Sequence, residues 1–142
     1  MVLETPRNPD CRVADVEAYA AAARAVPGGA ARVVVDATFA PPPVQRPLTA
    51  GADVVMHSST KYLCGHSDAM GGALCVTDAA LAAQLREERT AMGSTPGNLE
   101  CWLLLRSLRT LHLRVQRQCE TATALVAWLH AAVVRCRCIA WR

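Results

Sequence analysis

Short apolar runs alternate with polar turns through the first half of the chain, as they do where strands and helices follow one another. An alanine-rich stretch from residue 13 to about residue 25 predicts a helix, which ends at Pro27 and the glycines after it, because proline and paired glycines break helices. The β-branched run 32–36 predicts a strand that ends in a carboxylate, Asp36. This alternation of helix and strand implies a parallel sheet.

Two more strands and a capped helix are predicted in the same half. Residues 41–43 are three prolines, which exclude a helix interior and a central strand and so predict a rigid loop. The second and third predicted strands cover 53–57 and 71–76, and Asp78 is a good N-cap for a helix over 79–92. The predicted fold class is therefore α/β, with a mainly parallel sheet and flanking helices.

The second half of the chain has helical spacing. Residues 93–97 predict a break, with Thr95 as the N-cap and Pro96 at the first position of the next helix. From Asn98 the pattern predicts a long helical region that continues through 121–134. Its apolar face is mixed and includes Leu99, Trp102, Leu103, Leu111 and Val115.

A partly one-sided basic stripe lies on the same helical region. It consists of Arg106, Arg109, Arg114 and Arg117. A solvated helix face is the more common interpretation of such a stripe, since charged side chains prefer the surface. A contact with a phosphate or a partner is the alternative.

Length, charge and cysteine usage narrow the class of protein. The 142 residues suit one domain, and a formal charge of +3 lies far from the basic bias of a nucleic-acid-binding module. No run of about eighteen apolar residues predicts a membrane span. Seven cysteines at scattered spacing do not indicate a disulfide framework, and no signal segment is recognisable, so reduced thiols in the cytoplasm are expected.

Lys61 is the only lysine in the chain, and it follows the second predicted strand. Lysine, unlike arginine, can form a Schiff base, most readily where burial favours the neutral amine. The alternative is an exposed lysine that persists by chance in an arginine-rich chain. Asp36 ends the preceding strand, and ligands of open α/β sheets gather at such strand ends, so we expect both residues to face one crevice.

An amine, a carboxylate and two hydroxyls in one crevice suit pyridoxal 5'-phosphate. Lys61 would hold the aldehyde, Asp36 would keep the pyridine nitrogen protonated, and Ser58 and Thr60 would bind the phosphate. Each residue also has a simpler interpretation. Asp36 could cap the next turn, and Ser58 and Thr60 could be ordinary turn hydroxyls.

Several segments resemble one known enzyme family. They are residues 4–9, 35–40, 45–48 and 51–68, which include the string Ser-x-Thr-Lys-Tyr-x-x-Gly-His over 58–66. They are similar to the transsulfuration enzymes, the pyridoxal-phosphate enzymes of cysteine and methionine metabolism. This family includes cystathionine γ-synthase, cystathionine γ- and β-lyases, methionine γ-lyase and the O-acylhomoserine sulfhydrylases. The resemblance extends from Glu4 to about Leu129, and the string with its aspartate is highly specific.

The resemblance implies a fold, a reaction class and further site residues. The fold would be part of the large domain of the type I pyridoxal-phosphate transferases. The reaction would be γ- or β-elimination or replacement on a sulfur amino acid or an acylated homoserine, in a homo-oligomer. Asn8 matches the asparagine that binds the cofactor's ring hydroxyl, although an asparagine before proline also starts turns. Glu4 is a weaker candidate, and Lys61 would also move protons on the substrate.

The resemblance also predicts how the chain is organised. Residues 1–134 would be a partial cofactor-binding large domain, truncated at both ends, and residues 135–142 an atypical tail. The family's phosphate-gripping glycine loop and its arginine for the substrate carboxylate have no counterpart here. The alternative function is therefore a non-catalytic remnant, which binds cofactor weakly or acts as an interaction module.

A metal site is the weakest of the candidate sites. His57 and His66, with Cys64 and Cys75 nearby, could ligate a metal, but the paired short spacings typical of zinc sites are absent. The Cys136-x-Cys138 pair is too short for the usual zinc-finger pairing. We therefore expect no metal.

Overall fold

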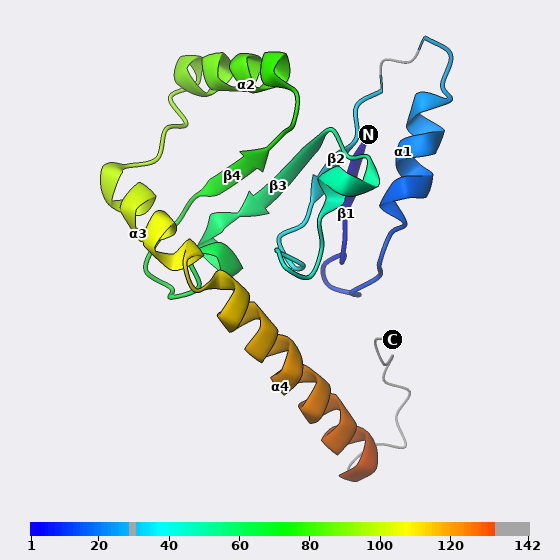
Figure 1. The fold of residues 1–142 in the computed structure, drawn as a ribbon, viewed down its shortest axis with the longest axis vertical. Coiled ribbons are helices and arrows are strands. Elements are labelled where there is room, and N and C mark those ends of the chain that lie inside the picture. The colour runs from blue at the N-terminus through cyan, green and yellow to red at the C-terminus, as the bar shows by residue number, and fades with distance from the viewer. Residues whose placement is uncertain (29–30, 133–142) are drawn as a thin grey trace.

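A computed structural model of the protein describes residues 1–28 and 31–132, and it shows one four-stranded sheet with helices around it (Figure 1). The strands lie in the order β1-β2-β3-β4. They are β1 (Val2–Glu4), β2 (Val34–Asp36), β3 (Val54–Ser58) and β4 (Gly72–Cys75). The first three strands are parallel, and β4 is antiparallel to β3. The prediction of a mainly parallel sheet in an α/β fold is therefore confirmed.

One helix separates β1 from β2 along the chain, and the other helices follow β4. They are α1 (Val16–Arg24), α2 (Ala79–Ala91), α3 (Asn98–Leu108) and α4 (Leu111–Ala132), with a 3-10 turn at Pro47–Ala50 and a π-helical turn at Ser59–Leu63. Figure 1 shows α4 leaving the sheet as a long arm. Only its first turns pack near the strands, because the buried residues of this helix are Leu111 and Val115.

Two apolar clusters hold the elements together. The larger lies between α1 and the sheet, and it consists of Val16, Ala20, Ala23, Val33, Val35, Ala37, Ala52 and Val55. The smaller joins the π-helical turn to α4 through Leu63, Leu111 and Val115. The helix in the second cluster thus packs directly on the turn that carries Lys61.

Most predicted elements are present, and two helix starts differ from the prediction: the helix expected from residue 13 begins at Val16, and α3 begins later than expected. Asp78 caps α2 as expected, since its carboxylate accepts hydrogen bonds from Ala80 N (2.8 Å) and Leu81 N (3.1 Å). Thr95 and Pro96 do not begin a helix. The N-cap of α3 is Gly97, so that prediction is wrong.

Two further elements differ from the prediction. The predicted single helical region divides into α3 and α4 at residues 109–110. The strand β1, which ends at Glu4, was not among the predicted elements. The predicted atypical tail, 135–142, lies outside the described residues.

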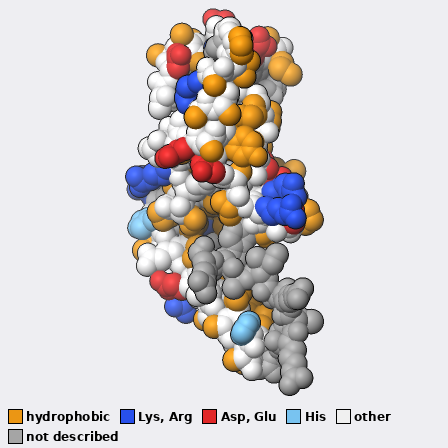
Figure 2. Space-filling model, turned by 90° about the vertical axis from the view of Figure 1, so that its right-hand side faces the viewer, with side chains coloured by type: hydrophobic (Ala, Val, Ile, Leu, Met, Phe, Trp, Pro, Cys, Tyr) orange, Lys and Arg blue, Asp and Glu red, His pale blue; other side chains and the backbone are white. Residues whose placement is uncertain are grey.

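The surface carries many apolar side chains. Leu99 is 63% exposed and Trp102 58%, so the predicted apolar face of α3 is largely open to solvent. Figure 2 shows hydrophobic side chains scattered over the face that it presents. Within the described part of the chain, no helix has the length and apolar character needed to cross a membrane.

Candidate functional site

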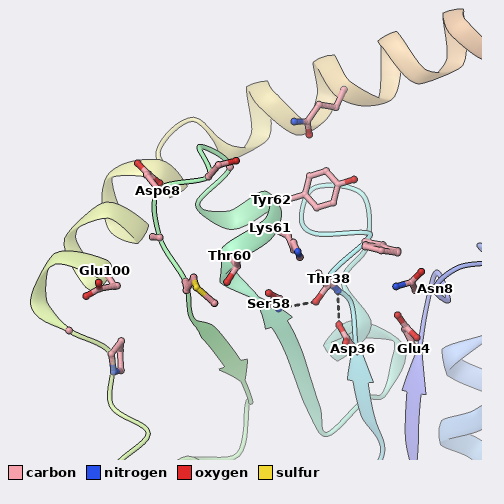
Figure 3. A pocket seen from close by; sticks show the side chains of 18 residues that line it. Glu4, Asn8, Asp36, Thr38, Ser58, Thr60, Lys61, Tyr62, Asp68 and Glu100 are labelled. Atoms are coloured by element: carbon pink, nitrogen blue, oxygen red, sulfur yellow. Dashed lines mark hydrogen bonds between the residues drawn. The ribbon is translucent and has the colours of Figure 1, made fainter.

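An open pocket of about 1320 Å³ lies at the carboxyl ends of the three parallel strands (Figure 3). The predicted site residues all line it: Asn8, Asp36, Ser58, Thr60 and Lys61, together with Glu4. They come from four separate stretches of the chain. The parallel register explains the convergence, because Glu4 pairs with Asp36 and Asp36 pairs with Met56, two residues before Ser58.

Asp36 is half-buried at the end of β2, with its carboxylate held by the chain immediately after it. Its Oδ1 accepts a hydrogen bond from Thr38 N at 2.9 Å. This is the turn-capping role that the sequence left as an alternative, and it uses one of the two carboxylate oxygens. The same side chain lines the pocket, so capping and ligand contact are compatible.

Thr38 is a site residue that sequence reasoning missed. Its Oγ1 accepts a hydrogen bond from Ser58 N at 2.8 Å, which ties the end of β2 to the end of β3 (Figure 3). The available signal was a hydroxyl two residues after a strand-end aspartate, a common turn pattern. Thr38 therefore fixes the spacing between Asp36 and Ser58.

Thr60 is held against the start of β4. Its Oγ1 accepts a hydrogen bond from Gly71 N at 3.0 Å, and Ser59 N donates to Gly71 O at 2.9 Å. Thr60 therefore has a structural contact in addition to its place in the pocket. Ser58, on the neighbouring strand end, lies half-buried in the same lining.

Lys61 lies in the π-helical turn, with non-helical backbone angles of φ −87° and ψ −121°. Its side chain enters the pocket between those of Thr60 and Tyr62 (Figure 3). Lys61 is exposed, and the sequence had left both a buried and an exposed lysine open. The reason is the open form of the pocket, which leaves the amine in contact with solvent.

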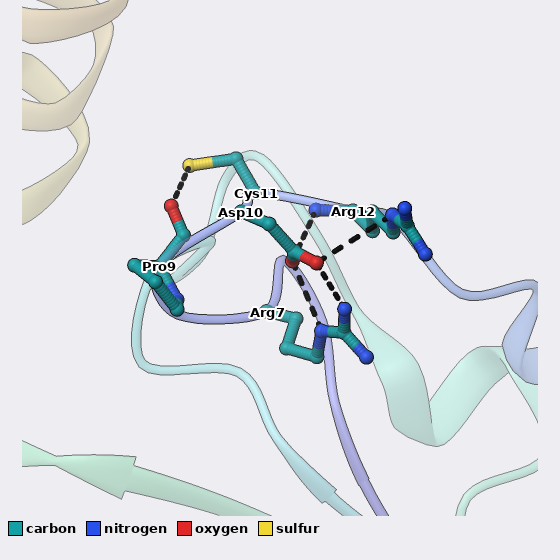
Figure 4. Close-up of polar contacts among 5 residues, drawn as sticks. All are labelled: Arg7, Pro9, Asp10, Cys11 and Arg12. Carbon is teal, nitrogen blue, oxygen red and sulfur yellow. Dashed lines mark hydrogen bonds and ion pairs between the residues drawn. The ribbon is translucent and has the colours of Figure 1, made fainter.

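Asn8 lies between Arg7 and Pro9 in a loop whose polar contacts centre on Asp10. Figure 4 shows these contacts of Asp10 with Arg7 and Arg12. Arg7 donates two hydrogen bonds to the Asp10 carboxylate, and Arg12 Nε lies 3.5 Å from it. The hydrogen bond from Arg7 is the main reason that the pKa of Asp10 falls to about 2, with contributions from Arg12. Asp10 therefore stays ionised at neutral pH, and the loop presents Asn8 at the pocket's edge.

The four metal-ligand candidates do not gather in one site within the described residues. His57 is buried, and burial lowers its pKa, opposed by a backbone hydrogen bond at Ala37 and the charge of Asp36. His66 Nδ1 contacts the carbonyl of Cys64, whose thiol has its pKa raised chiefly by burial. No group of three or more potential ligands forms a metal-binding cluster in residues 1–28 and 31–132.

The pocket is completed by residues that the sequence did not indicate. They are Phe39, Tyr62, Asp68, Glu100 and Gln118, among others. Glu100 and Gln118 come from α3 and α4, so these helices form one wall. Their helical spacing gave no sign of this role, because the pocket depends on how α3 and the first turns of α4 pack against the π-helical turn.

The donor set fits pyridoxal phosphate. One amine faces one carboxylate, and hydroxyl and amide groups surround them, which matches the aldehyde, the ring nitrogen, the phosphate and the ring hydroxyl of that cofactor. The Asp36 carboxylate forms no ion pair in the described residues, whose salt bridges all involve Asp10 or Glu120. Fold and site thus define the class of pyridoxal-phosphate-dependent α/β enzymes.

Comparison with known proteins specifies the family. A family model described as "Cys/Met metabolism PLP-dependent enzyme" matches residues 1–136. The chain belongs to this family of pyridoxal-phosphate-dependent lyases and transferases of cysteine and methionine metabolism. The resemblance stated from the sequence motifs is thereby confirmed.

Individual relatives carry several activities in their names. A cystathionine gamma-synthase from Mycobacterium tuberculosis is 44% identical over 127 residues, which cover 89% of this chain and 32% of the relative. A cystathionine beta-lyase from Bacillus subtilis is 39% identical over 135 residues, covering 94% and 34%. The chain therefore spans about a third of the length of these curated relatives.

Solved structures agree with the fold. The crystal structure of an apo methionine gamma lyase from Micromonospora echinospora has a TM-score of 0.87 and 49% identity, covering 94% of this chain and 36% of that one. A cystathionine gamma synthase from Xanthomonas oryzae pv. oryzae, in complex with aminoacrylate and cysteine, has a TM-score of 0.73 and 45% identity, covering 78% and 28%. The α/β fold of the family's large domain is thus confirmed.

Proposed function

We propose that this chain binds pyridoxal phosphate through Lys61 and forms the cofactor side of a site that acts on sulfur amino acids or acylated homoserines. The observation that carries the proposal is the convergence of Lys61, Asp36, Ser58 and Thr60 in one pocket. Chance would not be expected to bring the only lysine of the chain beside a strand-end carboxylate and two hydroxyls.

Pyridoxal phosphate, when bound, supplies an electron sink for carbanion chemistry at the substrate's α-carbon. Lys61 would hold the aldehyde of the cofactor, and its Nζ would take and return protons on the substrate. Asp36 would keep a proton on the ring nitrogen through its negative charge. Ser58 and Thr60 would donate hydrogen bonds to the phosphate, and Asn8 would bind the ring hydroxyl.

The substrate class rests on the family, and the reaction is an elimination or a replacement. Relatives are named as a synthase, a β-lyase and a methionine γ-lyase, so the choice among these reactions is left to experiment. Residues 1–134 serve as a partial cofactor-binding domain in this proposal. The free cysteines Cys11, Cys64, Cys75, Cys101 and Cys119 support a reducing, cytoplasmic setting.

Cofactor binding and turnover are tested separately on the purified chain. Titration with pyridoxal phosphate should produce the absorbance band of a bound Schiff base in the wild type and in Arg46→Gln, whose side chain lies outside the pocket lining. Lys61→Ala, in which only the amino terminus remains as a primary amine, should show at most a weak band. Cystathionine, methionine and O-acylhomoserine are then offered to the loaded chain, with keto acid and thiol release as readouts. A band without turnover would favour the non-catalytic alternative, and absence of the band in the wild type would contradict cofactor binding.

A further inference from the structure

Arg114 differs from the other members of the basic stripe in what it contacts. Its Nη1 donates to the carbonyl of Tyr62 at 2.9 Å, and its Nη2 donates to the carbonyl of Leu63 at 3.3 Å. Nη2 also donates to the carbonyl of Ser107 at 2.9 Å. The first two acceptors directly follow Lys61 in the chain.

The guanidinium is suited to this position by charge as well as by shape. Tyr62 and Leu63 end the π-helical turn, and carbonyls at the end of a helical turn attract a cation. A planar fork can reach two consecutive carbonyls together, which a single ammonium group cannot do with the same geometry. Arg114 Nε donates a hydrogen bond to Thr110 Oγ1 at 3.1 Å, so each of the three guanidinium nitrogens has an acceptor.

Gly65 provides an independent sign of this contact. It has a φ of +70°, and a Cβ built on it would overlap Arg114 Nη1. Gly93 has nearly the same backbone angle, φ +68°, but a Cβ there would have nothing within 4 Å. A side chain at position 65 would therefore push the guanidinium away from the turn, in addition to the cost of the backbone angle.

We propose that Arg114 is a positioning residue, which clamps the end of the Lys61 turn to the α3–α4 junction and so holds the lysine in the orientation that reacts with pyridoxal phosphate. The inference rests on the proposed function in taking Lys61 as the cofactor lysine. Two of the other stripe members have different partners: Arg106 lies over the ring of Trp102 at 5.9 Å, and Arg117 pairs with Glu120. Of these three arginines, Arg114 is the one that contacts the Lys61 turn.

The test compares Arg114→Gln with Arg117→Gln, which loses an equal charge one turn away on the same helix and keeps Lys61 as the only lysine. In the cofactor-free chain, hydrogen exchange of the amides of Cys64 and Gly65 should be about tenfold faster in Arg114→Gln. The free energy of one lost charge-assisted hydrogen bond corresponds to about that ratio of rates. Their present acceptors are Ser59 O and Lys61 O. Arg117→Gln should exchange as the wild type does.

The second readout is the reaction with pyridoxal phosphate. The visible band should form about tenfold more slowly in Arg114→Gln, on the same energy scale. The pH profile of the band should also shift in that variant, whereas a loss of global stability would reduce the amount bound without moving the profile. Gly65→Ala should reproduce both changes, and Gly93→Ala, with the same backbone strain, should not.

The outcomes separate the two proposals. If the wild type forms its adduct at Lys61 and both Arg114→Gln and Gly65→Ala match it in rate and pH profile, the positioning role is overturned and cofactor binding stands. If the wild type forms no adduct at Lys61, the proposed function fails, while exchange of the loop amides still decides whether Arg114 holds the turn. Should Arg114→Gln fail to fold, the pair Gly65→Ala and Gly93→Ala decides the question.

Discussion

Single residues at the pocket carry two kinds of contact at once. Asp36 caps a turn through Thr38 while it lines the pocket, and Thr60 bonds to Gly71 while it does the same. A substitution at either position therefore tests function cleanly only if it preserves the structural contact.

Asp36→Asn preserves the contact and removes the charge. The amide oxygen can still accept from Thr38 N, so the melting temperature should stay close to that of the wild type. Affinity for pyridoxal phosphate should fall about tenfold, since one opposite charge beside the ring nitrogen is worth roughly one pKa unit or more. Absorbance titration measures the affinity. Asp53→Asn, whose carboxylate accepts from Val33 N outside the pocket lining, is the control, and equal affinities for the two variants would rule out the role of Asp36.

The phosphate assignment predicts a difference between two ligands. Ser58→Ala should weaken pyridoxal phosphate binding about tenfold and change pyridoxal binding little, because only the first ligand offers the phosphate that the hydroxyl would bind. Ser94→Ala, at an exposed position between α2 and α3, should affect neither ligand. Isothermal titration with both ligands provides the comparison, and equal losses for both would contradict a phosphate contact at Ser58.

At the scale of elements, the sequence predicted those that carry strong local signals. Three of these signals have a local physical cause, and the elements they predict are present. They are the β-branched run 32–36, the strand predicted over 53–57 before Lys61, and the aspartate cap of α2. The strand β1 was missed because three residues give too short a pattern to identify a strand. The division between α3 and α4 was missed because residues 109–110 contain neither glycine nor proline.

The site was predictable to a similar degree and for similar reasons. Lys61, Asp36 and the two hydroxyls follow strands, and strand ends converge at one sheet edge in a parallel sheet. Thr38 and Arg114 act through contacts across 20 and about 50 residues of sequence, which no local pattern encodes. The exposure of Lys61 depends on the openness of the whole pocket.

A buried histidine on β3 should make the stability of the fold depend on pH. Burial lowers the pKa of His57 on β3 from its ordinary value of 6.5, so the unfolded chain binds the proton more readily than the folded one. Protonation of His57 therefore lowers the free energy of unfolding as the pH falls through 6.5. Well above that pH, His57 has no such effect. Thermal melts at pH 7.5 and pH 5.5 (both about one unit from that ordinary value) should show a loss at low pH in the wild type.

The variant His57→Gln isolates this effect. It cannot take up a proton, so its melting temperature should change less between the two pH values than that of the wild type. His112→Gln, at an exposed position on α4, should keep the wild-type dependence. An identical pH dependence in the wild type and His57→Gln would show that His57 is not the source.

At the scale of the whole molecule, exposed apolar surface predicts association. Leu99 and Trp102 on α3 are mostly exposed, as are Leu125 and Trp128 on the projecting part of α4. Surfaces of this kind favour self-association in water. Sedimentation velocity over a range of concentrations should show oligomers or aggregates, and the double variant Leu125→Gln/Trp128→Gln should reduce them. A monomer at every concentration would contradict this prediction.

The central claim is that the single lysine of the chain carries the cofactor. Borohydride reduction of the chain loaded with pyridoxal phosphate, followed by peptide mass mapping, tests it directly, because the chain offers only Lys61 and its amino terminus as primary amines. The account predicts a reduced pyridoxyl adduct on the peptide that contains Lys61. An adduct found solely at the amino terminus would contradict it.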